Sequence, residues 1–349
     1  MMESSIQRKE FDDVARTLPV LGELNGQSVL ITGATGLLGG QLAQTMLAYN
    51  RLFGKKIQVI VNGRNREKLH EIYGTLPVDY LISDIREHQR TDFPIDYIIH
   101  CASITSSQAF VKTPVDTIHT AITGTANILE LARQKKVKGF LYTSSLEVYG
   151  LPPKFKVGEN DYGQIDFLNV RSSYSESKRM VECLCKAYET QYGVPIKIAR
   201  LTQTIGSGID YNDNRVFAQF AKSVIERKNI ILNTPGQTVR SYCDICDAVK
   251  AIITILLHGN VGEAYNVANK ETVISIADMA QLVCDQNPEA NIKVVFNTPN
   301  DISKLGYNPE MKISLDTSKL EKLGWHADVT LGEMFQKLIT GLRENQSNE

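Results

Sequence analysis

Two side chains four residues apart are the first candidates for catalysis in this chain. Tyr174 and Lys178 occur in the sequence Tyr-Ser-Glu-Ser-Lys, and on a helix this spacing places both side chains on one face. A lysine ammonium there can lower the pKa of the phenol while the tyrosine exchanges a proton with a substrate. Ser145 ends an apolar run typical of a strand, and its hydroxyl can share the same substrate oxygen. These residue types predict proton transfer at a hydroxyl or keto group.

A glycine-rich turn upstream supplies the context for this chemistry. The apolar run 29–31 leads into Gly33-x-x-Gly36-x-x-Gly39, which opens a helical sequence. Glycines at these positions let the backbone approach a pyrophosphate, which then lies at the N-terminus of the helix. The strand before the turn and the helix after it predict a dinucleotide site, in which Lys178 holds the nicotinamide ribose. Four further residues are expected at this cofactor: Thr35, Leu37, Leu38 and Thr143.

The choice between NAD and NADP depends on the end of the second predicted strand. An acidic residue there binds the ribose hydroxyls of NAD, whereas this chain has Asn62 and Arg64. The missing acid and the arginine favour NADP, but an arginine at a helix start is also an ordinary solvated residue, so the cofactor stays open between NAD and NADP. Asp84 and Ile85, after the third predicted strand, are expected at the adenine edge, although an aspartate there is also ordinary turn chemistry.

Short runs rich in β-branched residues alternate with helical stretches from Ser28 onwards. This alternation predicts an α/β fold: a Rossmann-type doubly wound parallel sheet with a smaller C-terminal substrate-binding lobe. The predicted strands are 29–31, 57–61, 80–82, 97–99, 140–142 and 196–199, with another at 265–267. The expected organisation begins with an N-terminal leader at 1–26, made of a helix and then a turn at Pro19. A dinucleotide-binding domain follows at 27–206, and residues 207–345 form mainly the substrate-binding lobe. Near 240–268 the chain is expected to return to the dinucleotide-binding domain.

Composition excludes several classes of protein. The 349 residues contain 38 Lys and Arg against 39 Asp and Glu, so the net charge of −1 gives no general attraction to nucleic acids or anionic membranes. The N-terminus lacks the apolar run of a signal peptide, and no later stretch is apolar for long enough to span a bilayer. We therefore expect a soluble, cytoplasmic protein with neither nucleic-acid nor membrane partners.

Six cysteines, including Cys183-x-Cys185 and Cys243-x-x-Cys246, are expected to be free thiols without metal.

Taken together, the motifs resemble the extended short-chain dehydrogenase/reductase family (NAD-dependent epimerases and dehydratases), whose members modify nucleotide sugars. The resemblance runs from about Gln27 to about Leu342, and within the family it is most similar to UDP-glucuronate decarboxylases and nucleotide-sugar 4,6-dehydratases. It rests on the glycine turn and on these segments: His100-Cys101-Ala102-Ser103, Gly124-Thr125-Ala126-Asn127, Ser145-Leu146-Glu147-Val148-Tyr149-Gly150, Arg171-Ser172-Ser173-Tyr174 with Lys178, Val239-Arg240-Ser241-Tyr242 and Asp316-Thr317-Ser318-Lys319. The resemblance implies that Cys101, Ala102 and Ser103 also line the cofactor.

The resemblance implies a redox-neutral reaction that begins with oxidation. Tyr174 takes the proton of the sugar 4-hydroxyl while carbon 4 gives hydride to the nicotinamide, and the resulting 4-keto group acidifies carbon 5. Glu147 is expected near carbons 5 and 6, although a glutamate there can also be structural. Arg240 is expected to meet a substrate carboxylate or the diphosphate, because a guanidinium binds either in bidentate fashion. Arg215 and Gln203 are the remaining candidates for substrate binding.

Three positions depart from the family pattern and leave alternatives open. Leu146 replaces the polar residue of dehydratases and decarboxylases, Ala121 replaces an asparagine, and Gln203 begins a segment that replaces the usual nucleotide-sugar motif. A 4-epimerase, which needs only Ser145, Tyr174 and Lys178, stays open, as does an NADPH-dependent keto-sugar reductase. A protein that senses dinucleotides without turnover is a further alternative. The family also implies a homodimer and a place in polysaccharide biosynthesis.

Overall fold

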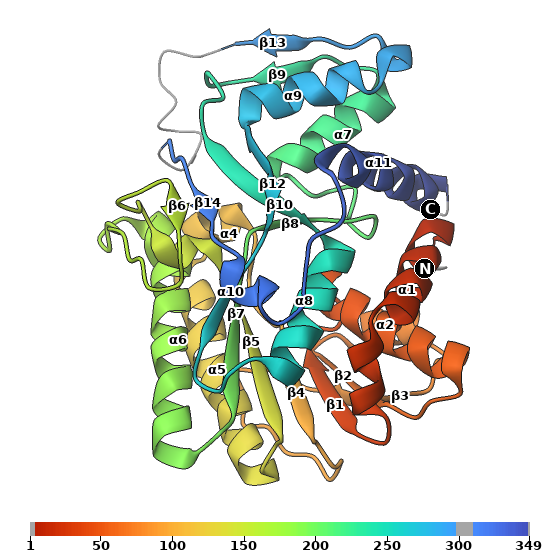
Figure 1. The fold of residues 1–349 in the computed structure, drawn as a ribbon, viewed down its shortest axis with the longest axis vertical. Helices are drawn as coiled ribbons and strands as arrows, with labels where there is room; N and C mark the ends of the chain where they lie inside the picture. The colour runs from red at the N-terminus through yellow and green to blue at the C-terminus, as the bar shows by residue number, and fades with distance from the viewer. Residues whose placement is uncertain (1–3, 298–309, 348–349) are drawn as a thin grey trace.

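A parallel sheet of seven strands forms the centre of the protein. The computed structural model describes residues 4–297 and 310–347, and its main sheet has the order β11-β7-β5-β4-β1-β2-β3 with every neighbouring pair parallel (Figure 1). The strands are β1 (Ser28–Thr32), β2 (Gln58–Gly63), β3 (Val78–Ile82), β4 (Tyr97–His100), β5 (Gly139–Ser145), β7 (Ile196–Leu201) and β11 (Ala264–Val267). The first strand, β1, lies in the interior of the sheet and the later strands extend towards both edges, so the predicted doubly wound sheet is confirmed.

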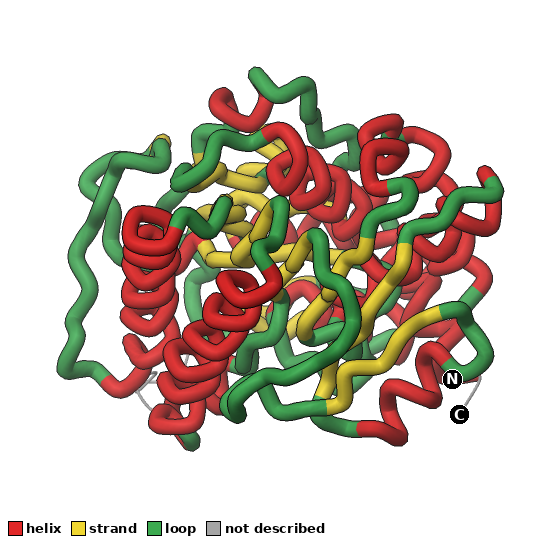
Figure 2. The backbone as a smooth tube through the Cα atoms, turned by 90° about the horizontal axis from the view of Figure 1, so that it is seen from below, coloured by secondary structure: helices red, strands yellow, loops and turns green. Residues whose placement is uncertain are grey.

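Helices cover both faces of this sheet, which explains why its strands are apolar on two sides (Figure 2). One face packs against α2 (Leu37–Phe53), α3 (Arg66–Tyr73) and α8 (Ile245–His258), and α1 (Ser5–Thr17) packs on the outside of α2 and α8. The other packs against α5 (Pro114–Lys135) and α6 (Ser173–Tyr192), with the short α4 (Ser107–Lys112) before α5. A search of the described helices finds none whose length and apolar character suffice to span a lipid bilayer.

The segment expected as a leader folds onto the rest of the chain. Within its described residues it forms α1 and the short helix η1 (Pro19–Leu24), as the helix-and-turn pattern predicts, while residues 1–3 lie outside the described part. The buried Glu10 accepts a hydrogen bond from Ser207 Oγ at 2.5 Å and lies 3.6 Å from Lys337 Nζ. Ser5 Oγ donates to Glu344 at 2.6 Å, so the two ends of the chain lie side by side (Figure 1).

A second, smaller unit lies beyond the carboxyl ends of the main strands (Figure 1). Its sheet has the order β12-β10-β8, and its own apolar core holds α7, α9 and α11. The strands and helices are β8 (Gln203–Ile205), α7 (Val216–Glu226), β9 (Ile230–Leu232), β10 (Val239–Asp244), β12 (Asn269–Ser275), α9 (Ile276–Asp285), β13 (Val294–Phe296) and α11 (Leu331–Ser347). Between the two units lie β6 (Lys156–Val157), β14 (Ser314–Leu315) and α10 (Ser318–Glu321). Part of the range 207–345, residues 298–309, lies outside the described residues.

A buried histidine beside the glycine turn makes stability depend on pH. Oγ1 of Thr32 lies 2.7 Å from Nδ1 of His100, and Oγ1 of Thr125 lies 3.0 Å from Nε2. Burial lowers the pKa of His100 to about 3. This pKa is lower than that of a histidine in the unfolded chain. The free energy of unfolding therefore decreases as the pH falls below about 6.5, by about 2 kcal/mol at pH 5. We expect His100→Gln to flatten the decrease in unfolding free energy between pH 7 and 5, measured by urea unfolding. The exposed His258 is the control: if His258→Gln flattens the profile equally, this explanation is wrong.

Candidate active site

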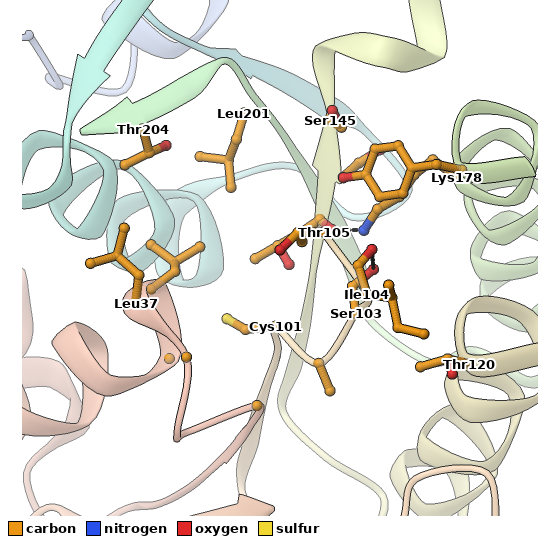
Figure 3. Close-up of a pocket in the computed structure, with 18 of the residues that line it drawn as sticks. Leu37, Cys101, Ser103, Ile104, Thr105, Thr120, Ser145, Lys178, Leu201 and Thr204 are labelled. Carbon is orange, nitrogen blue, oxygen red and sulfur yellow. Dashed lines mark hydrogen bonds between the residues drawn. The ribbon is translucent and has the colours of Figure 1, made fainter. Parts of the chain in front are cut away.

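A cavity of about 440 Å³ lies at the carboxyl ends of the main strands and reaches under the smaller unit. Every residue that the sequence analysis selected for catalysis, cofactor or substrate lines it, including Ile85, Ala102 and Ser103. Figure 3 shows Leu37 on one side, Ser145 and Lys178 on the other, and Cys101 between them. The parallel strands bring these distant positions together because their carboxyl ends meet at one edge.

The glycine turn fits a dinucleotide because side chains at Gly33 and Gly39 would have no room. Gly33 has φ +68°, and a Cβ on it would lie 2.8 Å from the backbone of Ala102. A Cβ on Gly39 would collide with the carbonyl oxygen of Gly33. Gly36 caps α2 without a side chain, so the N–H groups of the first turn stay open to the cavity. The backbone therefore provides the close approach and the helix N-terminus that a pyrophosphate needs.

Tyr174 and Lys178 lie one turn apart on α6, with both side chains buried at the cavity wall. The tyrosine ring stacks on Phe110, with ring centres 4.4 Å apart, and this contact fixes its orientation. Burial raises the pKa of Tyr174, the carboxylate of Glu147 raises it further, and a hydrogen bond with Ser145 lowers it. The structure therefore differs from the prediction that Lys178 lowers this pKa, because in the chain alone burial outweighs the positive charges.

Lys178 is held by the strand beside it rather than by a carboxylate. Its Nζ donates to the carbonyl oxygen of Thr143 at 2.8 Å and lies 4.7 Å from the ring centre of Tyr142. Burial lowers the pKa of Lys178 to about 8. Oγ1 of Thr143 donates to His100 O at 2.9 Å, which ties the ends of β4 and β5 together. Burial also raises the pKa of the neighbouring Cys101 to about 12, so this thiol is not a nucleophile at neutral pH.

Glu147 lies in the short helix η2 (Leu146–Tyr149) directly after β5, and both of its carboxylate oxygens are engaged. Arg171 Nη1 and Nη2 each donate to it at 3.0 Å, and Ser175 Oγ donates at 2.9 Å. The guanidinium of Arg171 also stacks over Phe110 at 4.7 Å from the ring centre. In the sequence Arg171 stands out only as part of a motif, and no role was predicted for it. Its place three residues before Tyr174, in the turn that begins α6, was the available signal.

Arg240 is the candidate substrate residue with the clearest geometry. It lies on β10 and lines the cavity, and its buried Nε has no hydrogen-bond partner among the described residues. A buried guanidinium nitrogen without a partner is costly unless a ligand satisfies it, so this atom indicates an anionic ligand. Arg215 is different, because Asp213 already pairs with it at 2.5 Å and its guanidinium lies over Phe217. Gln203 lines the cavity from β8.

The predicted cofactor residues Asn62 and Asp84, at the ends of β2 and β3, already make hydrogen bonds within the protein. The side-chain amide of Asn62 donates to Leu81 O at 2.9 Å and to Ser83 Oγ at 3.0 Å. Asp84 pairs with Arg86, and this hydrogen bonding lowers the pKa of Asp84. Arg64 lines the same end of the cavity and is exposed.

The cysteines lie away from any cluster of metal-ligating side chains. On α6, Cys183 is exposed and Cys185 is buried, so the two point to different faces of the helix. Within residues 4–297 and 310–347, no three His, Cys, Asp or Glu side chains come together in a way that could hold a metal ion.

Solved structures with the same fold come from nucleotide-sugar enzymes. The dTDP-glucose 4,6-dehydratase of Streptomyces venezuelae superposes with a TM-score of 0.78 at 21% identity, over 92% of this chain and 98% of that one. The UDP-glucose 4-epimerase of Thermotoga maritima superposes with a TM-score of 0.75 at 21% identity, over 93% and 100%. At this level of identity the likeness confirms the fold.

Sequence relatives are closer and share a name. This chain is 30% identical over 311 residues to UDP-glucuronic acid decarboxylase 3 of Arabidopsis thaliana, covering 87% of this chain and 86% of that protein. It is 29% identical over 359 residues to UDP-glucuronic acid decarboxylase 1 of Xenopus tropicalis, covering 99% and 80%. The model of the NAD dependent epimerase/dehydratase family matches residues 29–268. The chain therefore belongs to the NAD dependent epimerase/dehydratase family.

Proposed function

We propose that the protein decarboxylates UDP-glucuronate through a transient 4-keto sugar, with a bound dinucleotide that is regenerated in each cycle. The observation that carries this proposal is the buried, unpartnered Nε of Arg240 in the cavity that also holds Tyr174 and Lys178. A substrate with a carboxylate on the sugar supplies the partner that this guanidinium lacks. The naming of the sequence relatives supports the same substrate.

In the proposed reaction the cavity residues bind the sugar and move one proton. Tyr174 takes the proton of the 4-hydroxyl as general base, and Ser145 shares the same oxygen. Lys178 stays protonated near neutral pH, holds a ribose hydroxyl and stabilises the phenolate form of Tyr174 that accepts this proton. The glycine turn holds the pyrophosphate through the open N–H groups of α2. A nicotinamide held in this cavity would supply the hydride acceptor for carbon 4 and the hydride donor for the closing reduction.

The state of Glu147 favours decarboxylation over dehydration. Once carbon 4 is a ketone, the electrons of the bond between carbon 5 and the carboxylate move towards the keto oxygen as carbon dioxide leaves. Carbon 5 then takes up a proton from solvent water, and no base has to remove one first. Dehydration needs a base at carbon 5 and an acid at the 6-hydroxyl. Glu147 is fully engaged by Arg171 and Ser175, and the apolar Leu146 cannot serve as the acid.

Mass spectrometry of the products tests this proposal. The protein is incubated with catalytic NAD or NADP and, separately, with UDP-glucuronate, UDP-glucose and dTDP-glucose. Loss of carbon dioxide from UDP-glucuronate alone is the expected result. Loss of water from either glucose nucleotide establishes a 4,6-dehydratase instead. An isomer of unchanged mass, recognised by proton NMR of the recovered nucleotide sugar, establishes a 4-epimerase, for which Ser145, Tyr174 and Lys178 suffice.

We infer that two copies of the chain associate through α5 and α6, which lie side by side on one face of the sheet. Their outer surface exposes Val115, Ile118 and Met180, and large apolar side chains grouped on two neighbouring helices favour a symmetric interface. Light scattering after size exclusion is expected to give the mass of a dimer. Met180→Asp is expected to shift the protein to a monomer, whereas Val261→Asp, at another exposed apolar site, leaves the dimer intact. A monomeric parent protein contradicts the inference.

We place the enzyme in the cytoplasm, among the reactions that supply precursors for polysaccharides. The six free cysteines support a reducing compartment, since none is paired in the structure. Localisation of a tagged full-length chain by fractionation tests this placement, and recovery in an extracellular or membrane fraction contradicts it.

A further inference from the structure

We propose that Arg171 is a positioning residue for the base of the reaction: it binds Glu147 and cancels the charge of this carboxylate beside Tyr174, which keeps Tyr174 able to release its proton. The inference rests on the proposed function and deepens it, because Tyr174 is the base of that reaction. Three observations carry it. They are the double hydrogen bond between Arg171 and Glu147, the place of Arg171 outside the main cavity, and the aromatic contacts that join Arg171 to Tyr174.

Arg171 and Glu147 form an ion pair that is largely shielded from water. Nη1 and Nη2 of Arg171 each donate to a different carboxylate oxygen at 3.0 Å, and the two side chains are only 14% and 21% exposed. The fork of a guanidinium matches a carboxylate, and salt screens a partly buried pair less than an exposed one. One positive charge meets one negative charge, so the pair as a whole presents little net charge to Tyr174.

Arg171 acts from behind the active site. Glu147 lines the main cavity, whereas Arg171 is not among the described residues that line it. Arg171 instead lines a second cavity of about 150 Å³, together with Glu147 and Ser175. Its backbone N–H donates to Asn169 Oδ1 at 3.0 Å, which fixes the short helix η3 (Val170–Ser172) that carries it. A sugar in the main cavity meets Glu147, so Arg171 reaches the chemistry through other side chains.

Phe110 on α4 brings Arg171 close to the base. The guanidinium lies 4.7 Å from the centre of the Phe110 ring, and the ring of Tyr174 stacks on Phe110 at 4.4 Å. Ser173 Oγ donates to Phe110 O at 3.0 Å and ties the start of α6 to α4. Burial is the main reason why the pKa of Tyr174 is raised. The carboxylate of Glu147 raises it further, whereas Arg171 lowers it, so the two charges oppose each other at this phenol.

Other polar groups around Tyr174 do not replace this compensation. Among the described residues they are Lys178 on the same helix, with Nζ 5.6 Å from the ring centre of Tyr174, Tyr142 and Ser145 on β5, and Arg215 at the start of α7. All of them remain in place when Arg171 is removed. The carboxylate of Glu147 would then be an unpaired negative charge, and ionised Tyr174 would be a second one beside it. Like charges this close disfavour the ionised form of each group.

A pH titration of Tyr174 in the full chain with bound NAD measures this effect without a sugar and without turnover. The absorbance of tyrosinate is recorded against pH for each protein, and the trace of the same protein carrying Tyr174→Phe is subtracted. Arg171→Met is expected to raise the pKa of Tyr174 by about one pH unit or more, as an uncompensated charge nearby does. Methionine keeps a long apolar side chain at the position that packs on Phe110.

Two further variants separate charge from structure. Glu147→Gln leaves the charge of Arg171 unpaired and is expected to lower the pKa of Tyr174. The double variant, Arg171→Met with Glu147→Gln, carries neither charge and is expected to return this pKa to within about half a pH unit of the parent value. A merely structural role of Arg171 predicts no recovery in the double variant. If loss of Arg171 alone prevents folding, Glu147→Gln still decides, because an unchanged or raised pKa there contradicts the proposal.

Arg133→Met is the matched control. Arg133 on α5 likewise donates twice to a glutamate, Glu130, at 2.9 and 2.6 Å, and its guanidinium lies over the ring of Tyr192. This variant should leave the titration of Tyr174 unchanged. An unchanged titration in Arg171→Met overturns the proposal, as does a double variant that stays shifted like the single one. Such a failure leaves the proposed decarboxylation untouched, because that reaction is judged from its product. Conversely, a different sugar product leaves the titration result standing.

Discussion

Tyr174→Phe is expected to lower kcat on UDP-glucuronate by on the order of a thousandfold, the usual contribution of a positioned general base. The substitution removes one oxygen atom and keeps the ring, so the stacking on Phe110 that orients it is retained. Without the phenol oxygen nothing at this position can take the proton of the 4-hydroxyl, and the first oxidation fails. Stopped-flow absorbance of the reduced cofactor in a single turnover should show no transient reduction.

Two controls separate this chemical role from a structural one. Tyr192→Phe changes the same residue type at the exposed end of the same helix and should leave kcat within about twofold, as surface substitutions usually do. The Tyr174→Phe protein should bind cofactor and unfold at the temperature of the parent. A variant with unchanged turnover would contradict the assignment and would favour a protein that senses dinucleotides without catalysis.

Arg240→Leu is expected to reduce kcat/KM for UDP-glucuronate by on the order of a hundredfold, since a charge-assisted hydrogen bond contributes about 1.5–3 kcal/mol. The substitution removes a guanidinium whose Nε has no partner among the described residues, so no ion pair within that part of the protein is lost. Arg240→Lys should recover only part of the activity, because an ammonium cannot bind a carboxylate in bidentate fashion.

The binding of UDP alone decides which anion Arg240 meets. If the guanidinium binds the sugar carboxylate, the affinity for UDP changes little in Arg240→Leu. An equal loss for UDP and for UDP-glucuronate would assign it to the diphosphate and remove the main support for a carboxylated substrate. Arg215→Leu is the comparison, and a smaller effect is expected there because Asp213 already neutralises that side chain.

Most of the fold follows from local sequence patterns. Each predicted strand of the main sheet occurs in the structure. Runs of β-branched residues such as Ile57–Val61 are typical of strands that helices cover on both faces. The glycine turn was also predictable, because its spacing is a local pattern. In the structure Gly33 and Gly39 lie where a Cβ has no room. Parallel strand order then brings the glycine turn and Ser145 to one cavity, which Arg240 joins from β10 of the smaller sheet.

The charge environment of the site could not be predicted in the same way. The pairing of Glu147 with Arg171 depends on how the chain after η2 returns to the start of α6, and that path leaves no periodic signal in the sequence. The raised pKa of Tyr174 depends on burial, which spacing along a helix does not report. Likewise, the pairing of Asp84 with Arg86 at the cofactor end of the cavity was not predicted from the sequence. Side-chain pairing between loops is a tertiary property.

The most direct test of the account is proton NMR of the sugar product formed from UDP-glucuronate in deuterated water, with catalytic cofactor and no added reductant. The proposed decarboxylation predicts a UDP-pentose that has lost the carboxylate and carries one deuterium at carbon 5, from the protonation that follows loss of carbon dioxide. It also predicts that the cofactor is not consumed. A six-carbon product, or a reaction that proceeds only with stoichiometric reduced cofactor, would contradict it.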